Sequence, residues 1–150
     1  MSRRKLPHGV QIKLVADVLV RAQDQVLLVR YADTDKYDGQ SGWFLPDDFL
    51  HHGEHPTDAA KRILAEQVGM LGFEVALDHV ESFDGDDWHL IFHFKAETDA
   101  PAELKPSSAV RDARWFALTA LPPRDQVAHD GWALDVIATI SPASPLLDRE

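Results

Sequence analysis

The chain has 150 residues, of which 45% are hydrophobic, and it carries a formal net charge of −10 with no cysteine. This length suits one domain with one core, and the lack of cysteine excludes disulfides, thiolate zinc sites and cysteine nucleophiles. The acidic balance disfavours nucleic-acid binding, and no apolar run approaches the roughly 20 residues that a membrane helix needs. We therefore predict a single cytoplasmic domain over residues 1–150, with its core at about 10–140 and with no nucleic-acid or membrane partner.

The first quarter of the chain predicts a β-hairpin. Val10–Val20 and Val26–Tyr31 are rich in Val, Ile and Leu, and the polar residues Arg21–Gln25 separate them. A polar stretch with two glycines, Ala32–Gly42, predicts a loop. A short apolar stretch follows it and ends at Pro46.

Pro56–Val68 has the clearest helical pattern. Pro56 suits the first turn, where the side chain of Thr57 or Asp58 can accept hydrogen bonds from free backbone amides. Gly69 is a plausible stop. The apolar residues that recur at helical spacing are Ala59, Ala60, Ile63, Leu64 and Val68.

The second half predicts another hairpin and a short strand. Phe73–Phe83 and Trp88–Ala96 flank the turn Asp84–Asp87, and in the second of these segments residues alternate as a strand requires. Glu97–Ser108 contains two prolines and predicts a loop. Arg111–Phe116 predicts a short strand.

After Leu121-Pro122-Pro123, a helix is expected at about Asp125–Ile140, although its apolar residues only partly follow one face. The tail Ser141–Glu150 has two prolines and is expected to fray. Strand-rich segments with two separated helices indicate an α+β class, with helices packed on a mixed sheet.

Residues Trp43–Met70 resemble the Nudix box, whose pattern is Gly-x5-Glu-x7-Arg-Glu-U-x-Glu-Glu-x-Gly-U, where U is bulky and apolar. With Gly69 as the anchor, Pro46 also stands where the family commonly has a proline, and Gly53 precedes the first glutamate as it often does. The positions that match the formal pattern are Glu54, Arg62, Leu64, Glu66, Gly69 and Met70.

Three features depart from that pattern. Ile63 stands where the family has the glutamate after the arginine, and Gln67 replaces the second glutamate of the late pair. Asp47-Asp48 replaces the glycine pair that commonly follows the proline. Isoleucine cannot ligate a metal, and glutamine offers only a neutral carbonyl oxygen.

The flanking segments also resemble the family. Its members usually open with a hairpin similar to Val15–Tyr31, and they often carry an aromatic strand and a Leu-Pro before the last helix, as in Arg114–Phe116 and Leu121-Pro122. The resemblance thus covers about Val10–Ile140. It implies an α/β/α sandwich with a mixed β-sheet between helices.

The resemblance implies hydrolysis of a pyrophosphate bond in a nucleoside diphosphate derivative, with Mg²⁺ or Mn²⁺ bridging its phosphate oxygens. Such hard cations prefer oxygen ligands, and they orient and activate the attacking water. Glutamates at i, i+3 and i+4 share one face of a helix, and here those positions hold Ile63, Glu66 and Gln67. Only one carboxylate of three is left, so we expect a weakened or altered metal site formed by Glu66, Gln67, Asp47 and Asp48.

Several roles stay open at this level. Glu66, Arg62 and Glu54 are the candidate catalytic residues. Alternatively, Glu54 and Arg62 form an ion pair with a structural role only. Glu66 can ligate metal or pair with Arg62 one turn earlier. His51 and His52 can ligate a softer metal such as zinc or manganese. Alternatively they, His55 and the two aspartates are exposed loop residues with no common target.

Outside the box, a base-stacking residue and a distal carboxylate are expected from the family. Trp88, beside a turn, is the substrate-stacking candidate, whereas Trp115 and Trp132 suit the core better. Nothing in the sequence selects one distal carboxylate among Glu81, Asp86, Asp87, Glu103 and Asp112.

Two functional hypotheses follow. The first is a divergent, metal-dependent hydrolase acting on a small phosphorylated molecule. The second is a catalytically inactive Nudix-fold domain that binds a nucleotide or a protein. A third interpretation, an unrelated α+β domain with a chance match, requires that Trp43–Gly69 lack the strand-loop-helix arrangement. The chain is also compatible with a homodimer.

Overall fold

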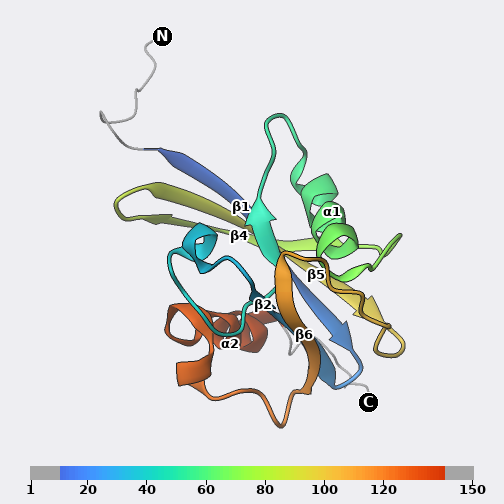
Figure 1. Ribbon diagram of the computed structural model, residues 1–150. Coiled ribbons are helices and arrows are strands. Elements are labelled where there is room, and N and C mark those ends of the chain that lie inside the picture. Colours follow the sequence, from blue (N-terminus) through green and yellow to red (C-terminus); the bar gives the residue numbers. More distant parts are fainter. Residues whose placement is uncertain (1–10, 141–150) are drawn as a thin grey trace.

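The structure is a computed structural model that describes residues 11–140. A six-stranded mixed sheet carries helix α1 on one face and helix α2 on the other (Figure 1). This arrangement confirms the predicted α+β class and the mixed sheet between helices. The elements are β1 Ile12–Ala22, β2 Gln25–Tyr31, η1 Thr34–Tyr37, β3 Asp47–Phe49, α1 Pro56–Val68, β4 Ala76–Asp84, β5 Trp88–Thr98, β6 Val110–Ala117, η2 Arg124–Gln126 and α2 Ala128–Ile140.

The centre of the sheet is β1, which pairs in parallel with β5 along its whole length. Its other edge is divided, because Arg21 and Ala22 pair with β2 whereas Val15–Asp17 pair with β3. Between these two sections, Val18 N donates to Pro46 O at 3.0 Å. The segment that includes β3 is thus inserted between β1 and β2, which fixes the positions of its two aspartates.

Both predicted hairpins are present. In the first, β1 continues through Arg21 and Ala22, which leaves a turn at Gln23-Asp24 that is shorter than the polar stretch suggested. Gln23 has a φ of 56° and supplies the left-handed residue that a tight hairpin turn requires. In the second hairpin, β4 begins at Ala76, later than expected. Val10 and the tail Ser141–Glu150 lie outside the described residues.

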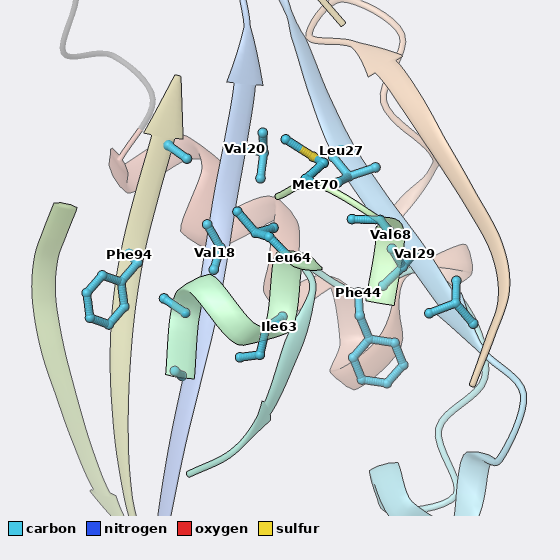
Figure 2. Packing of buried hydrophobic residues seen from close by; sticks show 14 of the residues in the cluster. Val18, Val20, Leu27, Val29, Phe44, Ile63, Leu64, Val68, Met70 and Phe94 are labelled. Carbon is cyan, nitrogen blue, oxygen red and sulfur yellow. The ribbon is translucent and has the colours of Figure 1, made fainter. Parts of the chain in front are cut away.

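Helix α1 has the predicted bounds, and its predicted apolar face is fully buried. The capping residue was predicted wrongly, because His55 Nδ1, and not Thr57 or Asp58, accepts the hydrogen bond of Thr57 N. Gly69 ends the helix at a φ of 75°, as the sequence predicted. Figure 2 shows the buried side chains that fill the layer between α1 and the central strands.

The last predicted helix, Asp125–Ile140, is divided. Val127 and Ala128 separate a 3-10 turn, η2, from three residues in the left-handed region, His129, Asp130 and Gly131. Regular helix begins only after Gly131. Arg124 stabilises this turn, since its Nη1 donates to Asp130 O at 2.8 Å and its Nη2 lies 2.7 Å from Asp135 Oδ1. No helix within residues 11–140 is long and apolar enough to cross a membrane.

The loop before β3 is attached to the segment before α2 by backbone contacts. Trp43 N donates to Gln126 O and Ala128 N donates to Trp43 O, each at 3.0 Å. Gly42 makes this approach feasible, because a Cβ there would lie 2.7 Å from Gln126 O and its φ is +108°. The position of α2 over the sheet therefore depends on the absence of a side chain at residue 42.

We expect Gly42→Ala to lower the free energy of unfolding by about 2 kcal/mol, because the new methyl group enters an occupied space at an unfavourable φ. Urea denaturation measures this loss. Gly85→Ala is the matched control, since a Cβ there meets nothing within 4 Å, and its effect should stay within about 0.5 kcal/mol. Equal effects of the two substitutions would contradict the role given to Gly42.

Candidate functional site

A cavity of about 340 Å³ opens on the α2 face of the sheet. Lys13 and Val15 of β1, together with Ile91 of β5, lie along the sheet side of the cavity, because they alternate with residues that face α1. Asp47, from the inserted segment, also lines it. The remaining lining residues are Lys36, Tyr37, Asp38, Phe44, Asp48, Phe49, Phe83, His89, His129 and Trp132.

The cavity combines flat aromatic walls with charged groups at its margin. Five of its lining residues are Tyr, Phe or Trp, and two are lysines. Lys13 Nζ pairs with Asp87 at 3.2 Å, and Lys36 Nζ pairs with Asp48 at 3.1 Å. Cavities with apolar walls and a few placed polar groups are typical ligand sites. This composition suits a small molecule that has both a ring system and an anionic group.

Arg62 is held by Glu54 in a two-pronged contact. Its Nε lies 2.8 Å from Glu54 Oε2, and its Nη2 lies 3.1 Å from Glu54 Oε1. Arg62 Nη2 also donates to Phe49 O at 3.0 Å, and Glu54 Oε1 accepts from His51 N at 2.9 Å. The guanidinium lowers the pKa of Glu54, chiefly through this hydrogen bonding. The pair therefore ties the loop before α1 to the helix, and this geometry favours the brace over a catalytic pair.

Asp48 lies between two cations. Its Oδ2 contacts Arg62 Nη1 at 3.0 Å, and its Oδ1 contacts Lys36 Nζ at 3.1 Å. Glu66 lies 3.5 Å from the same Arg62 nitrogen, but 65% of its side chain is exposed. Of the two roles considered for Glu66, the structure thus contains the pairing with Arg62. Both carboxylates already have positively charged partners.

Ile63 and Gln67, the two substituted box positions, point into the protein. Ile63 is fully buried in the core cluster under α1. The amide of Gln67 is used at both ends: Oε1 accepts from Tyr31 Oη at 2.8 Å, and Nε2 donates to Asp47 O at 2.8 Å. A carboxylate at residue 67 could not donate that second hydrogen bond. The neutral amide is therefore matched to its surroundings.

Asp47 is partly buried beside another carboxyl group. It stands opposite Asp17 in the register of β3 and β1, so both side chains emerge on the same face of the sheet. Burial raises the pKa of Asp47 well above its usual value, and the charges of Asp17 and Asp48 raise it further. Burial and these neighbours thus disfavour the charged carboxylate, which is the form that ligates a metal.

These donors do not fit the divalent cation that the family pattern implies. Gln67 is committed to hydrogen bonds, Asp48 is paired twice, and burial disfavours the charged form of Asp47. Among residues 11–140, no group of three or more His, Asp or Glu side chains is arranged to hold a metal ion.

The loop histidines do not converge. His55 caps α1 through Nδ1, while His51 and His52 are exposed, and none of the three lines the cavity. The candidates for a distal carboxylate are also dispersed. Asp87 pairs with Lys13, Asp112 pairs with Arg114 at 2.9 Å, and Asp86 and Glu103 are exposed. Only Glu81 belongs to a buried polar network.

The structure separates the two tryptophans considered for ligand contact. Trp88 lies at the start of β5, where its Nε1 donates to Ser82 Oγ at 2.9 Å, and it is not among the residues that line the cavity. Trp132, which the sequence assigned to the core, lines the cavity from α2. The spacing of apolar residues could not predict this position, because the left-handed turn that ends at Gly131 reorients the start of the helix.

A buried histidine that the sequence did not single out lies close to the cavity. His93 is fully buried, with Nδ1 2.8 Å from Asp17 Oδ1 and Nε2 2.9 Å from Glu81 Oε1. Asp17 is also fully buried, and its Oδ2 has no protein partner. Two sequence features could have indicated this pair: Asp17 is the one acidic residue in the apolar run of β1, and His93 occupies an alternating position in β5.

Sequence and structure comparisons agree on the origin of this architecture. The family model described as NUDIX domain matches residues 12–135. The chain belongs to the Nudix family. The matched range covers nearly all of the segment, about Val10–Ile140, that resembles the family. This match excludes the alternative of an unrelated α+β domain.

Solved Nudix structures share the fold at low sequence identity. A MutT NUDIX hydrolase from Burkholderia pseudomallei superposes with a TM-score of 0.65 at 16% identity, covering 87% of this chain and 98% of that one. A MutT/nudix family protein from Enterococcus faecalis superposes with a TM-score of 0.69 at 18% identity, covering 95% of this chain and 68% of that one. A C. elegans Ap4A hydrolase superposes with a TM-score of 0.57 at 14% identity, covering 87% of this chain and 88% of that one. No curated protein sequence matches the chain.

The hydrogen bonds of Gln67 lead to a stability prediction. Gln67→Glu should lower the free energy of unfolding by about 1–3 kcal/mol at neutral pH, because Asp47 O loses one of its two donors, Gln67 Nε2, and faces a charge. Chemical denaturation measures the loss. Glu66→Gln, at the exposed neighbouring position, should change stability by no more than about 0.5 kcal/mol. A stable Gln67→Glu protein would show that this amide is not required.

The environment of His93 leads to a pH prediction. Burial lowers the pKa of His93, but the hydrogen bonds and charges of Asp17 and Glu81 outweigh burial and leave the pKa raised. A raised folded-state pKa stabilises the fold below the unfolded value of about 6.5, and this stability is lost as pH rises through the folded-state pKa.

The free energy of unfolding should therefore fall above about pH 6.5 in the wild type. The fall should be smaller in His93→Gln, which has no imidazole to titrate at this site. Urea denaturation over a pH series measures both. His52→Gln, which removes an exposed histidine, should keep the wild-type pH dependence, and a change there as large as that of His93→Gln would refute the assignment.

Proposed function

We propose that this Nudix-fold chain binds a nucleoside diphosphate derivative, or a related phosphorylated metabolite, in the cavity between the sheet and α2. The observation that carries this proposal is the combination of aromatic walls with Lys13 and Lys36 in one cavity of about 340 Å³. An aromatic base can stack on such walls while an ammonium group contacts the phosphate. The names of two structural neighbours support this ligand class. One is the Ap4A hydrolase, and the other is a bifunctional NMN adenylyltransferase/ADP ribose pyrophosphatase from Francisella tularensis, of which the alignment covers 43%.

Hydrolysis of a pyrophosphate bond is the second candidate function. It is favoured by family membership and by the retention of Glu66, with Asp47 and Asp48 at the cavity. It is opposed by the burial of Ile63 and the hydrogen bonds of Gln67. Because the donor set does not fit the usual metal, the geometry supports binding more strongly than turnover.

Turnover is tested with nucleoside triphosphates, dinucleotides and nucleotide sugars, each with magnesium, manganese or zinc, while released phosphate and nucleotides are measured. We expect no turnover above the level without protein. Metal-dependent turnover that is abolished by chelator and by Glu66→Gln would establish the hydrolase instead. Turnover that survives Glu66→Gln would exclude the metal-site version of that hypothesis.

Binding predicts a role for Trp132. With ADP-ribose as the probe, Trp132→Leu should weaken the affinity by about tenfold, because the removal of a stacking surface costs ~1–3 kcal/mol. Calorimetry measures the dissociation constant. Trp88→Leu tests the tryptophan that the sequence favoured, and we expect a smaller effect because Trp88 lies outside the cavity lining. The reverse order of effects would restore Trp88 as the stacking residue.

A further inference from the structure

The mismatch between the box carboxylates and a divalent cation raises a question about charge. A bound diphosphate brings at least two negative charges to a cavity margin that already contains Asp38, Asp47 and Asp48. In the usual family site, the metal would balance these charges. Here, another positive group must do so, and the inference below rests on the proposed binding function.

Lys36 is the cation best placed for this role. Lys36 is one of the lining residues, 48% of its side chain is exposed, and its ammonium contacts Asp48 Oδ1 at 3.1 Å. An ammonium group has three donors, so contact with one carboxylate oxygen leaves others for a ligand. Asp48 does not depend on Lys36 alone, because Arg62 contacts its other oxygen at 3.0 Å. Lys36 can therefore turn towards an incoming phosphate without leaving Asp48 unpaired.

The position of Lys36 is connected to the substituted box residue. Gln67 accepts a hydrogen bond from Tyr31 Oη, and the Tyr31 ring stacks on Tyr37 with centroids 3.9 Å apart and planes 6° from parallel. Tyr37 is the next residue after Lys36 in η1. The side chain that replaces a metal-binding glutamate thus helps to hold the loop that carries the lysine.

Arg62 limits the repulsion between Asp48 and a phosphate. Its guanidinium contacts Asp48 Oδ2 at 3.0 Å, and Glu54 holds it in that position. Asp48 therefore keeps a positively charged partner when Lys36 contacts a ligand.

We propose that the cavity binds the phosphate of its ligand without a divalent cation, and that the Lys36 ammonium takes the place of the metal as the counter-charge. The Gln67–Tyr31–Tyr37 contacts then act as positioning contacts for the loop. The substitutions at residues 63 and 67 belong to this altered binding mode.

The test is calorimetric titration of the full chain with ADP and with ADP-ribose, in excess EDTA and in magnesium. We expect dissociation constants that agree within about twofold between the two conditions. Lys36→Gln should weaken binding about tenfold in EDTA, because a charge-assisted hydrogen bond to the phosphate is lost. Lys36→Arg should recover part of that loss because it keeps the charge.

Lys61→Gln is the matched control, since it removes the same charge from an exposed position of α1 outside the cavity, and its affinity should equal that of the wild type. Binding that occurs only with magnesium, or that is indifferent to Lys36→Gln, would overturn the metal-free mode and leave the binding function intact. A lack of binding of either probe in both conditions would overturn the proposed function itself, and this inference with it.

Discussion

The structure depends on how β1 divides its hydrogen bonds. One edge is fully paired with β5, so only the other edge can accept the inserted segment, and β2 takes just its last two residues. β3 therefore pairs at Val15–Asp17, which places Asp47 directly opposite Asp17. This pairing places Asp47 at the cavity on the α2 face, whereas the buried side of α1 packs on the opposite face. The cavity and the core under α1 therefore lie on opposite faces of β1.

The substituted box residues are best understood together. Ile63 enlarges the apolar core, and Gln67 joins a hydrogen-bonded group with Tyr31 and the backbone of Asp47. A metal site needs carboxylates whose charges are left for the cation, and unpaired buried charges are costly. Here each of Glu54, Asp48 and Glu66 contacts Arg62. Each of these carboxylates already has a positively charged partner within the protein, and Asp48 has a second one in Lys36.

Elements with strong periodicity were predictable, and contacts between distant segments were not. The bounds of α1 followed from Pro56, Gly69 and the apolar spacing, and the family resemblance supplied the sandwich. Sequence spacing could not reveal that Trp132 faces a cavity, because that depends on three left-handed residues before it. It also could not reveal the contact between Lys36 and Asp48, because the path of a polar loop is set by the stacking of Tyr37 on Tyr31.

The Asp17–His93 pair has a different physical character from the Arg62 cluster. A buried ion pair seldom stabilises a fold more than apolar residues of similar volume would, because desolvation offsets the attraction. Asp17 Oδ2 adds to that cost, since it lacks a protein partner. The pair nevertheless stands beside Asp47 in the register and within 5.5 Å, ring to ring, of Trp132. Burial raises the pKa of Asp17 as well, chiefly by desolvation, so the protonation of Asp17 and His93 is coupled next to the cavity that Trp132 lines.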